Sequence, residues 1–250
     1  MSADTPQLDD YKLEDRYLRE SGRVFLTGTQ ALVRIPLMQA ALDRKQGLNT
    51  AGLVSGYRGS PLGAVDQALW QAKDLLDENR IDFVPAINED LAATIMLGTP
   101  QVETDEDRQV EGVFGLWYGK GPGVDRTGDV FKHANAAGTS RFGGVLAVAG
   151  DDHACKSSTL PHQSDYAFLD AGMPVLNPAG IQDILDLGLY GWAMSRFSGC
   201  WIGFKALAEN MDSSISANLD LSRINIRIPT QFPMPEGGLN SRWPDKPMAQ

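Results

Sequence analysis

Short apolar segments alternate with longer segments of helical periodicity along most of the chain. In residues 64–78, apolar side chains recur every three or four positions, as on the buried face of a helix. Such an alternation, punctuated by Gly-rich turns, is typical of a parallel sheet covered by helices. The sequence therefore predicts an α/β fold with a doubly wound, mainly parallel sheet and helices on both faces. Strands are expected at 50–55, 82–87, 113–118, 144–149, 174–176 and 200–204. Helices are expected at 30–46, 64–78, 88–98 and 181–197, the first with Thr29 as its N-cap. A further helix is expected to follow a loop at 119–129 and to end near residue 138.

The bulk composition fits one large folded domain and excludes some partners. The chain has 250 residues, of which 42% are hydrophobic. Its net charge of −10 argues against a nucleic-acid partner, because few cations are left to neutralise phosphates. No run approaches the roughly eighteen apolar residues that a membrane span needs. The polar, acidic beginning of the chain is unlike a signal peptide, so we expect a soluble cytoplasmic protein.

The two cysteines, Cys155 and Cys200, are far apart in the sequence. They exclude a disulfide framework and a CxxC-type zinc or iron–sulfur site within this segment. Cys155 lies near His153 and His162 in a long polar segment, but the three match no metal-ligand spacing. No metal site is predicted here.

Polar or Gly-rich segments follow the carboxyl ends of several predicted strands. They are GYRGSPLG at 56–63, INED at 87–90, GKGPGVDRTGD at 119–129 and GDDHACKSSTLPHQSD at 150–165. Ligands of open parallel sheets bind outside the carboxyl ends of the strands. We therefore expect these segments to meet at one edge of the sheet and to form one composite site.

Each segment also has an ordinary structural interpretation. GYRGSPLG is consistent with a simple strand-to-helix turn, with Gly59 at positive φ and Pro61 near the first helical turn. A Walker A loop is excluded, because no GK[ST] follows. Glu89 is consistent with a surface charge at a helix start, yet it lies between an apolar strand and the apolar run LAATIML, which is not a typical solvated face.

A second motif imitates a known cofactor site. Thiamine enzymes hold their diphosphate through Mg²⁺ with a GDG motif and an Asn some twenty-five to thirty residues later. In this sequence, Gly150-Asp151-Asp152 and Asn177 have roughly that spacing. Asp152 replaces the second Gly of that motif, and Pro178 follows Asn177 directly. We interpret the similarity as a coincidence.

Taken in order, these segments resemble the 2-oxoacid:ferredoxin oxidoreductases. GYRGSP is similar to the YPxTP motif of that family: Tyr57 and Pro61 match, Ser60 takes the Thr position, and Arg58 departs from the Pro. NEDLAAT is similar to the NEKVA-like helix start, which puts Glu89 on the Glu that contacts the aminopyrimidine.

Two further segments resemble the indolepyruvate type in its long fused form. They are YGKGPGVDRTGD and GGVLAVAGDDHACKSSTLPHQSDYAF, the second followed by MPVLNPAG. The resemblance covers roughly residues 20 to 210 and lies in the ordered set of segments rather than in any single one. It implies a thiamine-pyrophosphate-binding fold of the pyrimidine type, with residues 1–22 as an N-terminal extension, 23–220 as the pyrimidine-binding domain and 221–250 as a linker toward a downstream domain.

The resemblance also implies site residues. Glu89 corresponds to the catalytic carboxyl group at N1′ of the pyrimidine. Ser60, Arg58 and Lys120 correspond to the substrate rim. The cofactor-binding set comprises Tyr57, Gly59, Pro61, Asn88 and Glu89.

The activity implied is oxidative decarboxylation of a 2-oxoacid, such as indolepyruvate or another arylpyruvate, to an acyl-CoA. Thiamine pyrophosphate with Mg²⁺, coenzyme A, a 4Fe-4S cluster and ferredoxin take part, and the enzyme is expected to be a homo-oligomer, such as a dimer. The diphosphate site and the cluster ligands are expected on a downstream domain, so the segment alone is expected to be inactive. Two alternatives stay open: a non-catalytic scaffold subunit of an electron-transfer complex, and a transketolase-like or decarboxylase-like thiamine enzyme.

Overall fold

The computed structural model describes residues 11–233, in which six parallel strands form one sheet. The strand order is β3-β2-β4-β5-β7-β6, and every neighbouring pair is parallel. This confirms the predicted α/β class and all six expected strands, five of them with small shifts of their ends. The strands are β2 (Thr50–Gly56), β3 (Ile81–Phe83), β4 (Gly112–Lys120), β5 (Val145–Gly150), β6 (Val175–Leu176) and β7 (Ile202–Lys205).

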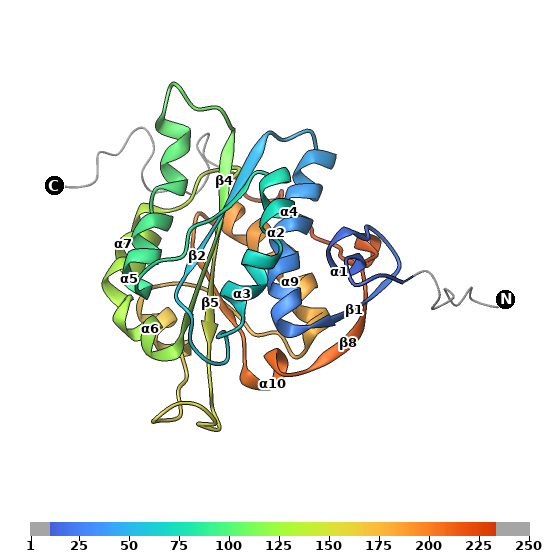
Figure 1. Ribbon diagram of the computed structural model, residues 1–250. Helices are drawn as coiled ribbons and strands as arrows, with labels where there is room; N and C mark the ends of the chain where they lie inside the picture. The colour runs from blue at the N-terminus through green and yellow to red at the C-terminus, as the bar shows by residue number, and fades with distance from the viewer. Residues whose placement is uncertain (1–10, 234–250) are drawn as a thin grey trace.

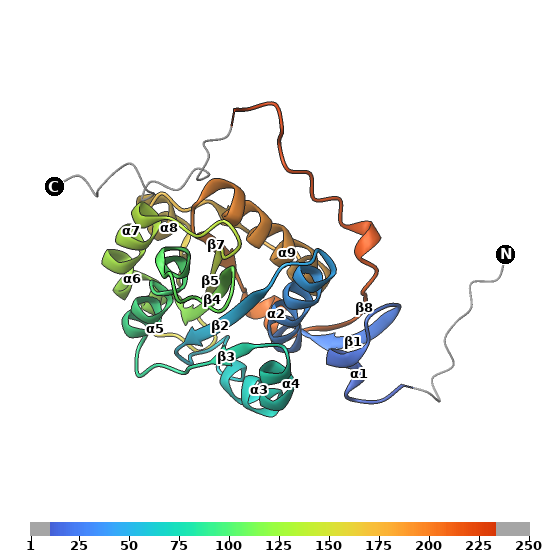
Figure 2. The same ribbon diagram turned by 90° about the horizontal axis from the view of Figure 1, so that it is seen from above.

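Helices cover both faces of this sheet, as predicted (Figures 1 and 2). One face carries α2 (Gly28–Lys45), α3 (Val65–Gln71), α4 (Lys73–Glu78) and α9 (Ile181–Ser198). The opposite face carries α5 (Glu89–Met96), α6 (Gly121–Arg126), α7 (Gly128–Ala137) and α8 (Asp165–Asp170).

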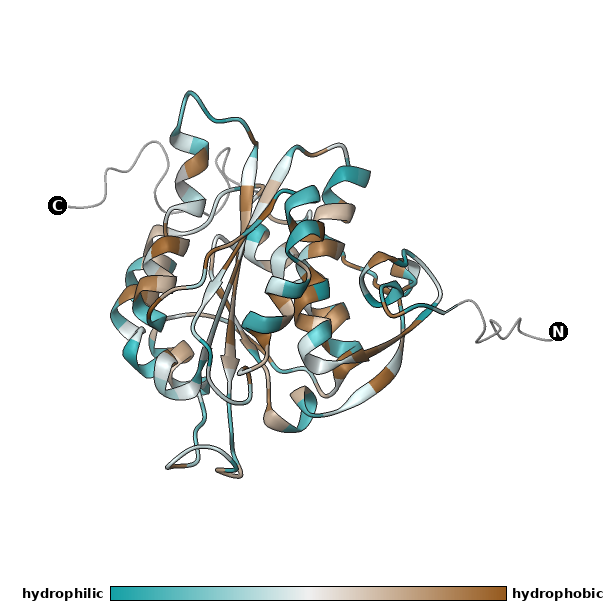
Figure 3. Cartoon of the chain, viewed as in Figure 1, coloured by the Kyte–Doolittle hydropathy of each residue, from teal (hydrophilic) through white to brown (hydrophobic). Residues whose placement is uncertain are grey.

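The two-residue period of the strands divides the core into two layers. In β5, Leu146 and Val148 pack with α2 and α9, whereas Val145, Ala147 and Ala149 pack with α5, α7 and α8. All five side chains are fully buried, because successive residues of a strand point to opposite faces and both faces are covered. The apolar colours of the helices in Figure 3 accordingly lie largely toward the sheet.

A small antiparallel sheet that the sequence analysis did not predict lies beside the main one. Strand β1 (Arg23–Thr27) pairs with β8 (Ser214–Asn218), so that Arg23 lies opposite Asn218. Helices α1 (Asp15–Leu18) and α10 (Ala208–Met211) precede β1 and β8, respectively. Both strands are short, and they are far apart in the sequence, so the local sequence of neither strand indicates that they pair.

Four local predictions were wrong in detail. The N-cap of α2 is Thr27, whose hydroxyl accepts from the backbone N–H of Gln30 in a capping box, and not Thr29. The helix expected at 64–78 is broken at Ala72 into α3 and α4. The strand expected at 82–87 ends at Phe83. Within the expected 119–129 loop lies α6, which begins beside Pro122, a residue well suited to a first helical turn.

The ends of the described region pack on the helices. Arg34 of α2 is buried and donates to the backbone carbonyl groups of Arg16 and Arg19. After the 3-10 turn η3 (Leu221–Arg223), Ile224 and Ile226 pack against the core. A second 3-10 turn, η2 (Thr99–Thr104), follows α5 in the middle of the chain.

The outer parts of the proposed N-terminal extension and linker, 1–10 and 234–250, lie outside the described residues. Within 11–233, no helix combines the length and apolarity needed to cross a bilayer.

Candidate functional site

The strand register brings the predicted segments to one edge of the sheet. Gly56 at the end of β2 pairs with Tyr118 of β4, and Lys120 at the end of β4 pairs with Gly150 of β5. The chain leaves β2 toward α3 on one face and leaves β4 toward α6 on the other. Two neighbouring strands with helices on opposite faces form a topological switch point, where open parallel sheets bind ligands.

The loop after β2 closes over this edge. The backbone N–H of Tyr57 donates to the carbonyl of Tyr118 at 3.1 Å, and the Ser60–Pro61 peptide is cis. Gly59 does not have the positive φ that we expected. Its role is steric instead: a β-carbon at Gly59 would lie 3.0 Å from the β-carbon of Lys120. This glycine therefore lets the β2 loop and the end of β4 approach each other.

Asn88 and Glu89 begin α5, as predicted. The side-chain oxygen of Asn88 accepts from the backbone N–H of Leu91 at 2.8 Å, so this amide caps the helix. The indole Nε1 of Trp117, which is fully buried in β4, donates to the carbonyl of Glu89 at 3.0 Å. The start of α5 is thus held from both sides, and Glu89 has a fixed backbone position.

The Glu89 side chain lies against two glycines. A β-carbon at Gly123 would lie 2.4 Å from its Oε1, and a β-carbon at Gly119 would lie 3.0 Å from its Cγ. Side chains at either glycine would take the space that the carboxylate occupies. Among residues 11–233 no donor binds the carboxylate, and the residue is half-buried, so part of the carboxylate stays accessible from outside.

An ion pair joins α5 and α6 next to Glu89. The Arg126 Nε donates to Oδ2 of Asp90 at 2.9 Å. This hydrogen bond, together with the charges of Asp90 and Glu89, raises the pKa of Arg126. The Thr127 hydroxyl, at the end of α6, donates to the carbonyl of Gly123 and lies 3.4 Å from Oδ1 of Asp90.

The residues predicted for a substrate rim lie around the same edge but are more open. Ser60, Arg58 and Tyr57 are exposed, and Arg58 has no ion-pair partner in the described part of the chain. Lys120 is half-buried, and its Nζ donates to the carbonyl of Ser157 at 3.1 Å. Lys120 therefore links β4 to the loop after β5, which the sequence did not indicate.

The GDG-like motif does not form a free pair of carboxylates. Asp151 is fully buried, accepts from the backbone and hydroxyl of Ser164, and lies 3.2 Å from Nζ of Lys205. Hydrogen bonds from the backbone N–H groups of Ser157 and Lys156 lower the pKa of Asp152. Both carboxylates are used within the loop, and Asn177 is exposed after β6, with β7 between it and β5.

Several residues that shape this edge were missed by sequence reasoning. Gly119, Gly123 and Trp117 fix Glu89, and their roles depend on distances between separate segments. Lys205, buried at the end of β7, pairs with Asp151 and Asp165. A lysine that ends the otherwise apolar run IGF was the one available signal for it.

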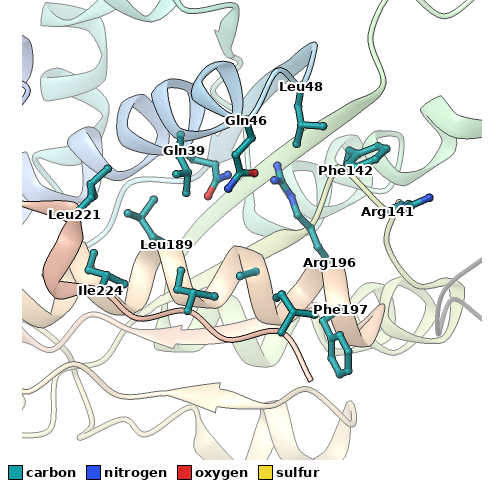
Figure 4. A pocket seen from close by; sticks show the side chains of 14 residues that line it. Gln39, Gln46, Leu48, Arg141, Phe142, Leu189, Arg196, Phe197, Leu221 and Ile224 are labelled. Carbon is teal, nitrogen blue, oxygen red and sulfur yellow. The ribbon is translucent and has the colours of Figure 1, made fainter. Parts of the chain in front are cut away.

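The cavity drawn in Figure 4 lies at the other end of the sheet. It has a volume of about 510 Å³ and lies between the carboxyl-terminal parts of α2 and α9, near the starts of β2 and β5. Its polar edge includes Arg196, whose guanidinium binds both oxygens of the buried Asp43 at 2.7 and 2.8 Å. These groups bind each other, and the cavity lies at the opposite end of the sheet from Glu89, so we do not include it in the site.

Comparison with known proteins defines the class of fold. No protein-family profile and no curated protein matches the chain. Among solved structures, the chain is similar to part of a 2-oxoacid-oxidising enzyme. That structure is a 2-oxoglutarate:ferredoxin oxidoreductase from Magnetococcus marinus, with 2-oxoglutarate, coenzyme A and succinyl-CoA bound. The TM-score is 0.56 with 16% identity, over 78% of this chain and 31% of the matched chain. The match shows a shared fold and covers about a third of the matched chain's length.

Proposed function

We propose that this chain is the pyrimidine-binding part of a thiamine-pyrophosphate-dependent 2-oxoacid oxidoreductase. The shared fold supports the general class. The finer proposal is an indolepyruvate or arylpyruvate substrate, converted to an acyl-CoA with electrons passing through a 4Fe-4S cluster to ferredoxin. It rests on the ordered resemblance of the loops, from GYRGSP to the segment after β5.

The observation that carries the proposal is the placement of Glu89. Its carboxylate lies beside the switch point of the sheet, is bounded by Gly119 and Gly123, and receives no hydrogen bond from the described residues. An aminopyrimidine ring offers a nitrogen that shares a proton with a carboxyl group, so the residues present fit this half of the cofactor. Asn88, whose amide is used as the helix cap, contributes through the backbone position of Glu89.

In this proposal, Glu89 holds a proton at N1′ of the pyrimidine. Thiamine pyrophosphate supplies, when bound, a carbon nucleophile for the 2-oxo group. Tyr57, Gly59 and Pro61, on the loop after β2, are the other residues that would hold the cofactor. Ser60 and Arg58 face solvent and are available to bind the substrate carboxylate by a hydroxyl donor and a charge.

A second domain is needed to complete this site. We assign the Mg²⁺-bound diphosphate to a downstream domain, because Asp151 and Asp152 are engaged by their own loop. The cluster ligands are assigned there too, because the given sequence has only two cysteines, far apart. Leu91 and Ile95 lie four residues apart on α5, Ile87 precedes the helix, and all three remain 40–80% exposed. These exposed apolar side chains, in and before α5, are a surface that such a domain would cover.

The test is Glu89→Gln in the full-length protein. The amide keeps the shape of the side chain, so thiamine pyrophosphate binding measured by calorimetry should weaken only modestly. Turnover of arylpyruvates with coenzyme A and a dye or ferredoxin acceptor should fall by about two to four orders of magnitude, the usual contribution of a positioned acid–base group. Exchange of the C2 proton of the bound cofactor, followed by NMR, should slow in parallel.

Glu78→Gln, an exposed change at the end of α4, is the matched control and should leave all three measurements unchanged. If Glu89→Gln kept more than about a tenth of the wild-type turnover, the assigned role would be wrong. A protein that binds no thiamine pyrophosphate at all would favour the scaffold alternative. Turnover without any electron acceptor would favour a decarboxylase-like enzyme.

A further inference from the structure

A second cavity lies beside the amino-terminal helix α1. Its volume is about 570 Å³, and its walls come from α1, α2, α4 and the segment around η3. Helices α1, α2 and α4 are neighbours in Figure 2. Because α2 and α4 end just before β2 and β3 begin, the cavity lies toward the starts of these strands, at the end of the sheet opposite Glu89. The proposed function does not use it.

The volume and the apolar part of the wall suit a small molecule. Ligand sites in proteins have volumes of roughly 300–1,000 Å³ and are lined mainly by apolar side chains, with a few polar groups that orient the ligand. The apolar wall here includes Leu18, Leu37, Met38, Leu75, Leu219 and Leu221. Such a wall favours a ligand with an apolar body.

The wall also contains a buried arginine. Arg34, near the middle of α2, is 4% exposed, and its two Nη atoms donate to the carbonyl groups of Arg16 and Arg19. Its Nε is buried and has no hydrogen-bond partner among residues 11–233. Burial lowers the pKa of Arg34 to about 10, so the side chain is still charged at neutral pH.

The charge of Arg34 is not compensated by the described part of the chain. The carbonyl groups of Arg16 and Arg19 accept hydrogen bonds but carry no full negative charge, and a neutral amide could also donate to them. No carboxylate within residues 11–233 pairs with Arg34. Buried charges in proteins are normally paired, so a counter-charge is expected at this guanidinium.

A hydroxyl donor lies close to this charge. Tyr17 of α1 lines the same cavity, and its hydroxyl forms no hydrogen bond with another described residue. Burial outweighs the charges of Arg16 and Arg34 and raises the pKa of Tyr17, so the hydroxyl keeps its proton at neutral pH. A guanidinium and a hydroxyl donor together match the acceptor oxygens of a carboxylate.

The remaining charged residues of the wall are mostly positive. Arg19, Arg44 and Lys45 line the cavity with Arg34, against one carboxylate, that of Glu20. None of these four cations forms an ion pair with a described residue. Arg44 and Lys45 have an ordinary role in the last turn of α2, where cations stabilise the helix dipole. Arg34 is far from that turn, so its charge needs another explanation.

We propose that this cavity binds a small carboxylate with an apolar body, whose negative charge pairs with Arg34 and whose oxygen accepts from Tyr17. The apolar wall holds the body of the ligand, and Arg19, Arg44 and Lys45 attract the anion from solvent. A monovalent carboxylate fits better than a phosphate, because a single buried guanidinium compensates a single charge. This inference goes beyond the proposed function and does not depend on it, because the two sites share no residue.

The test is calorimetric titration of the full-length protein with octanoate, which has one carboxylate and an apolar chain. Octanamide, its neutral analogue, is the matched ligand control. We expect one octanoate to bind per chain and octanamide to bind at least about tenfold more weakly, which is the contribution of a hydrogen bond to a charged group. The backbone amides of residues 16–20 and 37–45 should gain protection from hydrogen exchange when octanoate binds.

Two variants separate the charge from packing. Arg34→Gln keeps an amide donor for the carbonyl groups of α1 but removes the charge, so octanoate should bind about tenfold or more weakly while octanamide binding stays the same. Tyr17→Phe keeps the ring and should weaken octanoate binding by about fivefold. Arg227→Gln, on an exposed arginine outside the cavity, is the matched control and should bind as wild type. Should Arg34→Gln unfold, as judged by circular dichroism, Tyr17→Phe gives the same readout.

Four results would overturn the proposal. Equal affinity for octanoate and octanamide would show that the charge is not used, and tighter binding of inorganic phosphate would show an anion site without a role for the apolar wall. Octanoate-dependent protection at residues 57–61 rather than at 37–45 would place the probe at the other end of the sheet. Failure of wild type to bind octanoate would remove the site, and binding gained in Asp9→Asn or Asp10→Asn would then identify the chain's own carboxylate as the counter-charge.

The same measurements keep this proposal separate from the proposed function. Glu89→Gln should bind octanoate as wild type does, because Glu89 lies at the opposite end of the sheet. A protein that oxidises no 2-oxoacid but binds octanoate through Arg34 fails the proposed function and supports the carboxylate site. A protein that oxidises 2-oxoacids but binds octanoate equally in wild type and Arg34→Gln supports the function and overturns the site.

Discussion

A β-carbon at Gly123 would lie 2.4 Å from Oε1 of Glu89, well inside the contact distance of the two atoms. Gly123 is in the first turn of α6 and Glu89 is the first residue of α5, so one helix start is shaped around the side chain of another. The absence of a side chain at Gly123 is therefore part of the carboxylate site. It is also open to a direct test.

Gly123→Ala should displace the Glu89 carboxylate while leaving the fold intact. Backbone strain is not the reason, because Gly123 has no positive φ. We expect turnover of the full-length protein to fall at least about tenfold, as for other small displacements of a catalytic group. The matched control is Gly128→Ala at the start of α7, where a β-carbon meets nothing within 4 Å. Equal kinetics in the two variants would show that Glu89 does not need its present position.

Ser60→Ala should separate substrate binding from the role of Glu89. The Ser60 hydroxyl is exposed on the β2 loop, and its proposed partner is the carboxylate of the 2-oxoacid. Loss of one such donor should raise the KM of the 2-oxoacid by about tenfold, the equivalent of a hydrogen bond to a charged group. Exchange of the cofactor C2 proton should stay at the wild-type rate. An unchanged KM would remove Ser60 from the substrate rim.

The fold could be predicted well because its signals are local. An apolar strand buried on both faces, such as Val145–Gly150, is recognisable as a short apolar run between turns. The position of Glu89 at a helix start was also predictable, since Asn88 supplies a cap immediately before it. Once parallel strands are assumed, their carboxyl ends must share one edge.

The remaining features depend on distances between segments. The sequence indicates only that Lys205 ends an apolar strand. Its ion pair with Asp151, 54 positions earlier in the sequence, is formed by the fold. Likewise, Gly121 and His162 meet only because α6 and the β5 loop pack together. The pairing of β1 with β8 has the same origin. Sequence patterns identify the elements, whereas the contacts between loops require the structure.

The buried pair of Asp43 and Arg196 predicts a large loss of stability. Asp43 is 1% exposed and also accepts from Thr50 and Gln39. Asp43→Asn leaves the Arg196 guanidinium without its charge partner, which should lower the free energy of unfolding by about 3–5 kcal/mol. Urea denaturation followed by tryptophan fluorescence measures this, because Trp117, Trp192 and Trp201 are all buried.

Asp186→Asn is the matched control for that change. Asp186 also pairs with an arginine, Arg223, at 2.7 Å, but both side chains are partly exposed, at 23% and 31%. Surface ion pairs contribute about 0–1 kcal/mol, so this variant should stay close to wild type. Comparable losses in both variants would mean that burial does not determine the contribution of the Asp43 pair.

The pairing of Asp165 with Lys205 predicts a pH-dependent contribution to stability. Burial acts to raise the pKa of Asp165, but the hydrogen bond and charge of Lys205 outweigh it, so the pKa is lowered. A carboxyl group with a lowered pKa in the folded state stabilises the protein above its unfolded pKa of about 3.9. That contribution disappears as pH falls through the folded-state pKa. Asp165→Asn should therefore lose stability at neutral pH and converge on wild type in acid.

The expected loss at pH 7 is about 1 kcal/mol, reduced by solvent screening because the Asp165 side chain is 36% exposed. Urea denaturation at a series of pH values between about 3 and 7 gives the difference in unfolding free energy between variant and wild type. Asp170→Asn, on the same helix and in an exposed pair with Lys132, should show less than about 0.5 kcal/mol at every pH. A difference for Asp165→Asn that persists unchanged at the acid end would assign its effect to lost packing, because protonation of the wild-type carboxyl group would then have made no difference.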